Sequence, residues 1–367
     1  MTDAYGGSHT TALSGLAYTV VGALTSAITT LFSLYFPFWL APQAAAATYD
    51  LAFYNYVQEG VLHHFDTTVW TYGTDYGLAV VMLYFSWTLY ASKPTCGQVQ
   101  EHAVELDNRL CRRIWGLLLG YAVSVTAGAI SHQFYTDMTM RNTWHFRLLW
   151  TICVGTVTLA SLSMGCIGCE MARQFQPHTG GVSLPFVPEL FWKTFGLVTT
   201  AVCAFGWFSY QRPACDIFIA GITQFPSSFY MITVLWQAGV SNGGMTNMTS
   251  ATNKNNQAST TTTTTTTSRT PLCLYLRPFY QWMGMLSFIM NAPLLPLYPL
   301  LVQYTNWSLA TVNTFLHTWL LITWSMQAIS LRHVRHALLM TQQRPYKAVP
   351  IATSASAPAV VVVKKEN

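Results

Sequence analysis

The chain has 367 residues, of which 51% are hydrophobic and 8% are charged, and its formal net charge is +5. A soluble domain carries about 25% charged residues, so this composition excludes an ordinary water-soluble protein. There is no basic run with interleaved aromatic residues, so the sequence does not indicate nucleic acid as a partner.

The hydrophobic residues come in blocks of about 20, which is enough for a helix to cross a ~30 Å hydrocarbon core. Every backbone polar group must find an internal partner there, and long apolar blocks satisfy this as helices. The sequence therefore predicts an all-α polytopic transmembrane bundle with eight spans, seven being the alternative. We expect the spans at residues 14–40, 74–92, 114–136, 147–170, 190–210, 215–238, 277–302 and 307–330.

The spans fall into two blocks. A six-span block covers residues 1–238, and a two-span block covers residues 277–330. Between them, residues 239–276 form an Asn/Thr-rich segment that includes an unbroken threonine run, Thr260 to Thr267. Such a polar, low-complexity tract cannot bury a core, so we interpret it as a disordered linker. Residues 331–367 are expected to form a cytosolic tail.

The charges give the orientation. With the N-terminus in the cytosol, all basic residues except Arg141, Arg147 and Arg212 fall on the cytosolic side. This positive-inside bias supports eight spans with both termini cytosolic. Asn247, in an N-x-T sequon, would then stay without a glycan. Arg332, His333, Arg335 and His336 follow the last span and are interpreted as a basic anchor at the cytosolic surface.

The chain ends with Lys364 and Lys365 followed by two further residues. This arrangement resembles the dilysine retrieval signal of endoplasmic reticulum membrane proteins, which coat machinery reads in the cytosol. It implies an endoplasmic reticulum location, and a plain solvated basic tail is the alternative.

Ionisable residues inside spans are costly and therefore become functional candidates. The candidates are Asp75, His132, Asp216 and His317, with Asn291 and Asn313 as neutral companions. The predicted topology places the four ionisable groups between the membrane midplane and the lumenal surface. Alternatively, the groups at span ends face interfacial water, and His317 is bonded to a neighbouring helix.

Two imidazoles and a carboxylate at one depth are a suitable donor set for zinc. His132 and His317 would bind the metal, and Asp75 would act as third ligand or general base. Zinc lowers the pKa of a bound water to about 7 and so supplies hydroxide for hydrolysis. His63 and His64 lie in the first loop and could fold over the site, whereas the C-x-x-C pair of Cys166 and Cys169 is interpreted as helix packing.

Asp75 and the later run Gly128-Ala129-Ile130-Ser131-His132 resemble the CREST superfamily of membrane hydrolases, which includes alkaline ceramidases and progestin/adiponectin receptors. That pattern has an Asp, a Ser one turn before a His, and two histidines in the last span, which together bind zinc. The resemblance assigns Asp75, His132 and His317 to it. The chain departs from the pattern because the residues one turn either side of His317 are Asn313 and Leu321, and Gly128 takes the place of the Ser.

The sequence therefore favours a zinc-dependent hydrolase of the endoplasmic reticulum acting on a lipid amide or ester. A small-solute or lipid transporter is the first alternative, and it would explain the proline-rich breaks near Asn291 to Pro299. A non-catalytic receptor or scaffold is the second, and it would require no charged site.

Overall fold

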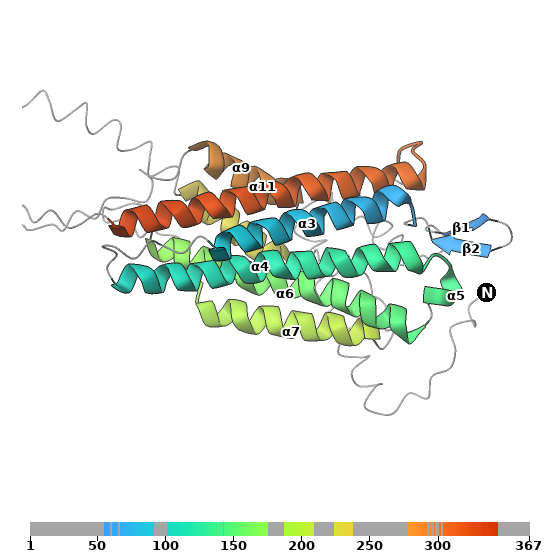
Figure 1. Ribbon diagram of the computed structural model, residues 1–367, viewed down its shortest axis with the longest axis horizontal. Helices are drawn as coiled ribbons and strands as arrows, with labels where there is room; N and C mark the ends of the chain where they lie inside the picture. Colours follow the sequence, from blue (N-terminus) through green and yellow to red (C-terminus); the bar gives the residue numbers. More distant parts are fainter. Residues whose placement is uncertain are drawn as a thin grey trace, which may run out of the picture.

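The computed structural model describes the helical bundle and a short hairpin, and in it the long helices lie side by side along one axis (Figure 1). The described residues are 55–58, 61–64, 67–91, 101–141, 143–174, 187–208, 224–237, 278–291, 294, 297, 301 and 304–343. Two predicted segments, the span at 14–40 and the linker at 239–276, lie outside the described residues.

Over the described residues, the bundle is built from seven long helical segments and one short helix. They are α3 (Val69–Ala91), α4 (Glu101–Phe134), α5 (Met138–Arg141), α6 (Trp144–Gln174), α7 (Glu189–Phe208), α9 (Pro278–Asn291) and α11 (Leu309–Gln343), together with helical residues 224–237. Helix α4 packs against α3 and α6, α6 packs against α7, and α11 packs against α3 and α9.

Side-chain caps mark where several helices begin. Each capping oxygen accepts a hydrogen bond from a backbone N–H in the first turn, which would otherwise lack an intrahelical partner. The caps are Thr68 for α3, Asp137 for α5, Thr143 for α6 and Ser308 for α11. Helix α9 instead begins at Pro278, where the missing N–H costs nothing.

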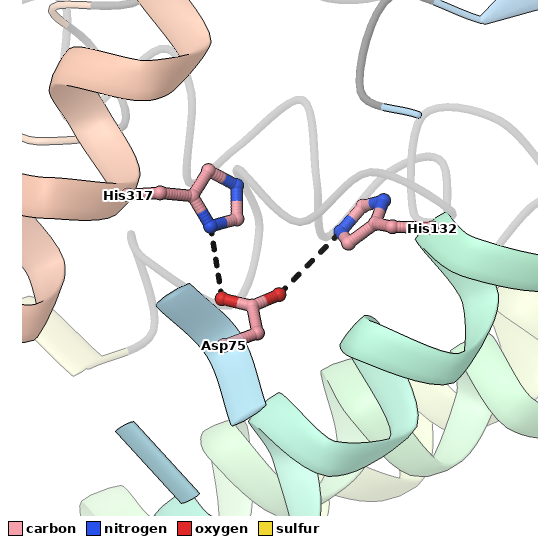
Figure 2. Close-up of side chains that lie close together, drawn as sticks. All are labelled: Asp75, His132 and His317. Carbon is pink, nitrogen blue, oxygen red and sulfur yellow. Dashed lines mark hydrogen bonds and ion pairs between the residues drawn. The ribbon is translucent and has the colours of Figure 1, made fainter. Parts of the chain in front are cut away.

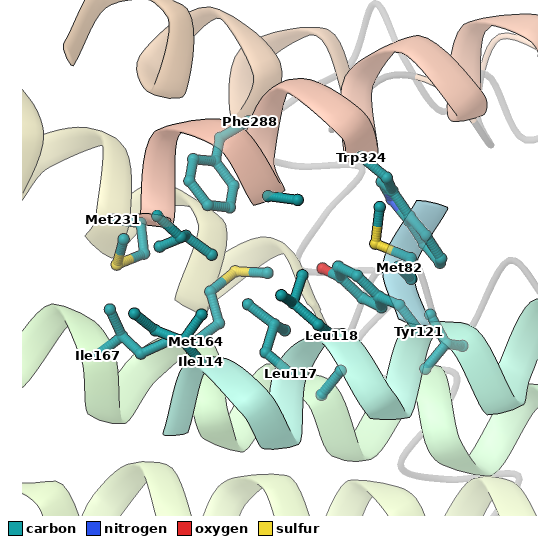
Figure 3. Close-up of a cluster of buried hydrophobic side chains, with 14 of the residues drawn as sticks. Met82, Ile114, Leu117, Leu118, Tyr121, Met164, Ile167, Met231, Phe288 and Trp324 are labelled. Atoms are coloured by element: carbon teal, nitrogen blue, oxygen red, sulfur yellow. The ribbon is translucent and has the colours of Figure 1, made fainter. Parts of the chain in front are cut away.

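A continuous apolar core joins the helices (Figure 3). Its largest fully buried side chains include Tyr121, Met164 and Phe288. The Tyr121 ring stacks on the Trp324 indole with ring centroids 3.8 Å apart, which links α4 to α11 in the middle of the bundle. Glycines allow α6 and α7 to approach closely, because a Cβ added at Gly196 would lie 2.6 Å from the Leu162 Cβ.

One segment departs from the all-helical expectation. Strands β1 (Asn55–Gln58) and β2 (Val61–His64) pair antiparallel, with Asn55 opposite His64 and Gln58 opposite Val61. The hairpin lies in the connection predicted to precede the second span, beside the α5 end of the bundle (Figure 1). The sequence predicts a connection between spans here and no helix, so the hairpin adds two short strands to a bundle that is otherwise helical over the described residues.

Two of the described helices are long and apolar enough to cross a membrane, over Asp107–Phe134 and Trp144–Arg173. They coincide with the predicted spans at 114–136 and 147–170. Several helices run beyond the predicted span ends, since α4 begins at Glu101 and α11 continues to Gln343. Helix α9 lies within the predicted span at 277–302, and beyond Asn291 the structure describes only residues 294, 297 and 301 of that span.

Helices α3 and α11 run parallel and in constant register. Thr71 contacts Asn313 and Asp75 contacts His317, and both pairs are separated by 242 residues. Helix α4 runs in the opposite direction, because its late residue His132 meets Asp75 while its early residue Cys111 contacts Leu89 at the other end of α3. The α5 end of the bundle therefore brings together the start of α3, the end of α4 and the first half of α11.

Candidate metal centre

Asp75, His132 and His317 converge near the α5 end of the bundle, one from each of α3, α4 and α11 (Figure 2). Asp75 lies in the second turn of α3, His132 lies in the last turn of α4, and His317 lies in the third turn of α11. The antiparallel course of α4 brings its C-terminal turn beside the first turns of the other two helices.

The carboxylate of Asp75 lies between the two imidazoles. Its Oδ1 atom is 2.8 Å from His317 Nδ1, which is a hydrogen bond, and its Oδ2 atom is 3.8 Å from His132 Nε2. The two rings are nearly perpendicular, with centroids 5.7 Å apart. One ligand atom from each of the three residues lies within 4.8 Å of the others.

The site is largely shielded from solvent. Asp75 is 4% exposed and His132 is 5% exposed, while His317 is partly buried. The indole of Trp150 packs edge-on against the His132 ring at 5.4 Å. A carboxylate buried in this way needs cationic or hydrogen-bonding partners, since an unpaired buried charge is strongly disfavoured. The two imidazoles supply such partners, and so would a metal cation.

Polar contacts between α3 and α11 flank the carboxylate. The side-chain amide of Asn313 donates a hydrogen bond to the Thr71 hydroxyl, one turn before the Asp75–His317 pair on both helices. The indole N–H of Trp70 donates to the Thr318 hydroxyl at 3.0 Å. Asn313 thus lies on the same helix face as His317, and its amide is used to join the two helices.

Gly128 leaves space beside the carboxylate. A Cβ added there would lie 3.4 Å from Asp75 Oδ2, 3.5 Å from Cys153 Sγ and 4.0 Å from His132 Nε2. These are ordinary contact distances, so a single methyl group would just fit. The buried thiol of Cys153, on α6, therefore borders the site, and the Ser124 hydroxyl next to it donates to the Cys153 carbonyl.

The donor types of these three residues are those that bind zinc in proteins. Zinc in enzymes is usually held by three protein ligands of the imidazole and carboxylate types, with a further position open. The structure provides two imidazoles and one carboxylate within 4.8 Å of one another. It thus contains an Asp-His-His triad that could hold a metal ion.

The remaining predicted site residues that the structure describes do not join this triad. Asn291 ends α9, and its side-chain oxygen accepts hydrogen bonds from the Trp324 indole at 3.2 Å and the Thr323 hydroxyl at 3.5 Å, so it fastens α9 to α11. Asp216, Lys364 and Lys365 lie outside the described residues. His63 and His64 belong to strand β2.

Two further sequence interpretations concern α4 and α6. The Ser131 hydroxyl donates to the Ala127 carbonyl one turn earlier in α4, at 2.8 Å. The Ser131 hydroxyl is therefore engaged by a backbone carbonyl of its own helix. Cys166 and Cys169 are buried in α6 as free thiols, in line with their interpretation as packing residues.

Arg335 requires a correction. We interpreted it as part of a basic surface anchor, but it is 5% exposed and holds the carboxylate of Asp107 through two hydrogen bonds of 2.7 and 2.8 Å. Burial alone would lower the pKa of this guanidinium, but the bonds and charge of Asp107 raise it above its ordinary value. The sequence signal was weak, because a cation just beyond an apolar block looks the same whether it is buried or exposed.

A second ion-pair network ties α4, α6 and α7 together at the same end as Arg335. The Arg113 guanidinium lies 2.7 Å from Glu170 and 2.8 Å from Glu189, and Arg109, Arg173 and Lys193 complete the cluster. Glu170 is 1% exposed, so its carboxylate depends on these cations for compensation. Within the described residues, most of the basic side chains thus gather at the end opposite α5.

Comparison of the chain with protein-family models, with curated proteins and with solved structures found no match.

Proposed function

We propose that this protein is a multi-pass membrane hydrolase that uses zinc to cleave an amide or ester bond of a lipid. The observation that carries the proposal is the convergence of Asp75, His132 and His317 from three separate helices. Ionisable side chains in apolar helices are expensive to keep, and their meeting at one buried point favours a functional site.

Zinc would be held by His132, His317 and Asp75, and when bound it supplies a Lewis acid that lowers the pKa of a coordinated water to about 7. The 2.8 Å bond between Asp75 Oδ1 and His317 Nδ1 orients that imidazole. The second carboxylate oxygen faces His132 and the space beside Gly128. Asp75 is therefore placed either to complete the ligand set or to accept a proton from the attacking water.

The bordering residues would protect this chemistry. Trp150 covers one side of the His132 ring, and Cys153 and Gly128 close another side of the site. Burial of this kind limits bulk water and strengthens the electrostatic interactions within the site. In the reaction itself, the acyl carbon gains the hydroxyl of water, the C–N or C–O bond breaks, and the leaving amine or alcohol takes the proton.

Membrane embedding is supported by the outer surface of the bundle. Large apolar side chains project outward along its length, including Val80 and Leu83 on α3 and Leu197 and Val198 on α7. A water-soluble monomer rarely exposes so much apolar surface. Exposed indoles such as Trp87, Trp144 and Trp282 fit an aromatic belt at a membrane surface. We therefore propose a polytopic bundle that crosses the membrane eight times.

The proposed location is the endoplasmic reticulum, with both termini cytosolic. The basic residues gathered opposite α5 would mark the cytosolic end, which follows the positive-inside rule. The metal triad would then lie toward the lumenal side. Lys364 and Lys365 would be read by coat machinery in the cytosol.

The test is hydrolysis by the purified protein in detergent or in vesicles, measured as fatty acid released from a panel of ceramides, acyl amides and glycerol esters. We expect zinc-dependent release from at least one class. His317→Ala should abolish it, whereas His145→Ala should not, because His145 is an exposed histidine at the same end. Full activity of well-folded His317→Ala would contradict the proposal.

The proline-rich sequence that follows α9 favours a transporter as a second candidate. Pro293, Pro296 and Pro299 fall inside a predicted span, and helix-breaking residues of this kind are typical of the discontinuous helices of many transporters. Uptake of a solute or lipid into vesicles, lost in His317→Ala and without any hydrolysis, would favour this candidate over the first.

A further inference from the structure

A buried two-bond ion pair lies at the far end of the bundle from the metal triad. Arg335 on α11 binds both carboxylate oxygens of Asp107 on α4, at 2.7 Å from Nε and 2.8 Å from Nη2. Its third nitrogen, Nη1, donates to the Leu89 carbonyl at the end of α3, at 3.0 Å. Asp107 is 2% exposed, so the whole contact is buried.

This contact joins the same three helices that carry the metal triad. Leu89, Asp107 and Arg335 lie on α3, α4 and α11, as do Asp75, His132 and His317. The second ion-pair network is different, because Arg113, Glu170 and Glu189 join α4 to α6 and α7. Of those helices only α4 contributes to the triad.

Between these two ends α11 packs against α3 and α4 mostly through apolar side chains, and the Tyr121 hydroxyl donates a hydrogen bond to Gln327 in the middle. Packing between apolar helices in lipid is not driven by the hydrophobic effect. Van der Waals packing and hydrogen bonds between helices hold such a bundle together, and a directional polar contact adds a restraint on the axial position. A planar guanidinium that holds a carboxylate with two bonds is a strongly directional contact, and specification of register is the best-attested role of buried polar groups.

We propose that Arg335 is a positioning residue: with Asp107 and the Leu89 carbonyl it fixes the axial register of α11 against α3 and α4, and so holds His317 opposite Asp75 and His132. Two contacts define the register of α3 and α11 that Arg335 maintains. They are Thr71 with Asn313 and Asp75 with His317, and the residues of each pair are 242 positions apart. A slide by one residue moves a helix by about 1.5 Å, which is enough to misplace a metal ligand.

The ordinary alternative is that the pair only stabilises the fold, and a double substitution separates the two roles. Replacing both partners of a buried ion pair by apolar residues generally preserves stability, whereas removing one partner does not. We therefore expect Arg335→Met with Asp107→Leu to keep the thermal midpoint of the wild type. Because this restraint on the register is lost, zinc affinity should fall about 10-fold, the usual size of a coupling between two distinct sites. Wild-type zinc affinity in this double variant would overturn the proposal.

The matched control is Arg113→Met, which removes a cation of α4 from the other network. This change should lower the thermal midpoint, since Glu170 and Glu189 lose a partner, and it should leave zinc affinity unchanged. An equal loss of zinc affinity in the control would show a general effect of destabilisation and would also overturn the proposal.

Because the inference rests on the proposed metal site, a second readout does not involve metal. Spin labels at Gly73→Cys and Ala310→Cys, both exposed, report the axial offset of α3 and α11 in a background without native cysteines. We expect the distance between labels to shift or broaden in the Arg335→Met, Asp107→Leu variant, and an unchanged distribution would overturn the proposal. If the wild type binds no zinc, the proposed function fails while this measurement still tests the register.

Discussion

At the scale of single residues, the carboxylate of Asp75 is the group on which the site depends, because it contacts both imidazoles. Asp75→Asn keeps the size of the side chain and removes its charge. We expect this variant to lose metal binding and hydrolysis while the protein stays folded. The measurement is zinc content and activity of protein that elutes as wild type on size exclusion. Retained zinc would show that the two histidines bind metal without Asp75.

Asn313 provides the matching control one turn before His317. The side-chain amide of Asn313 donates a hydrogen bond to the Thr71 hydroxyl, and Asn313 is not one of the three triad residues. Asn313→Ala should cost about 0.6–1.7 kcal/mol in unfolding free energy, the range for such bonds between membrane helices. Zinc content should be unchanged, and a complete loss of zinc would place Asn313 among the ligands.

These residues also show which parts of the site could be predicted. Asp75, His132 and His317 were identifiable because each interrupts an apolar block, and the triad is made of these three. Arg335 was misassigned because its partner Asp107 is 228 residues away. The sequence next to Arg335 and the sequence next to Asp107 do not indicate that the two residues pair. Asn291 and Asn313 were chosen as site companions, whereas their observed contacts join helices.

At the scale of helices, close packing of α6 and α7 depends on glycine. A Cβ added at Gly165 would overlap the indole of Trp192, which is a rigid ring and 3% exposed. Gly165→Ala should therefore destabilise the protein by about 1–3 kcal/mol, the usual cost of overpacking. Gly73→Ala is the control, because nothing lies within 4 Å of its added Cβ. Chemical unfolding in detergent measures both, and equal stability of the two variants would contradict this packing.

Helix ends were harder to predict than helix positions. Hydropathy locates the apolar part of a helix. The helix itself can extend into polar sequence, because backbone hydrogen bonds and packing against neighbouring helices continue there. Helix α4 therefore begins at Glu101, ahead of the span predicted from residue 114, and α11 continues to Gln343 beyond residue 330. The hairpin at residues 55–64 was missed because four-residue strands leave little periodic signal.

At the scale of the whole molecule, the proposed topology has a testable consequence. Eight spans with cytosolic termini place Asn247, in its N-x-T sequon, in the cytosol, so it should carry no glycan. A sequon inserted between Gln58 and Val61, beside the α5 end, should be glycosylated instead. A shift in electrophoretic mobility on glycosidase treatment reports both. A glycan on Asn247 would contradict the eight-span topology.

The metal content of the purified protein tests the central claim most directly. It should be measured on wild type, His132→Ala, His317→Ala and the control His145→Ala, each in detergent and after dialysis against a weak chelator. The account predicts about one zinc per chain in wild type and in His145→Ala, the expectation for a catalytic site, and none in the other two variants. Well-folded wild type without metal, even when zinc is supplied, would contradict the zinc site and leave the transporter and the receptor as the remaining candidates.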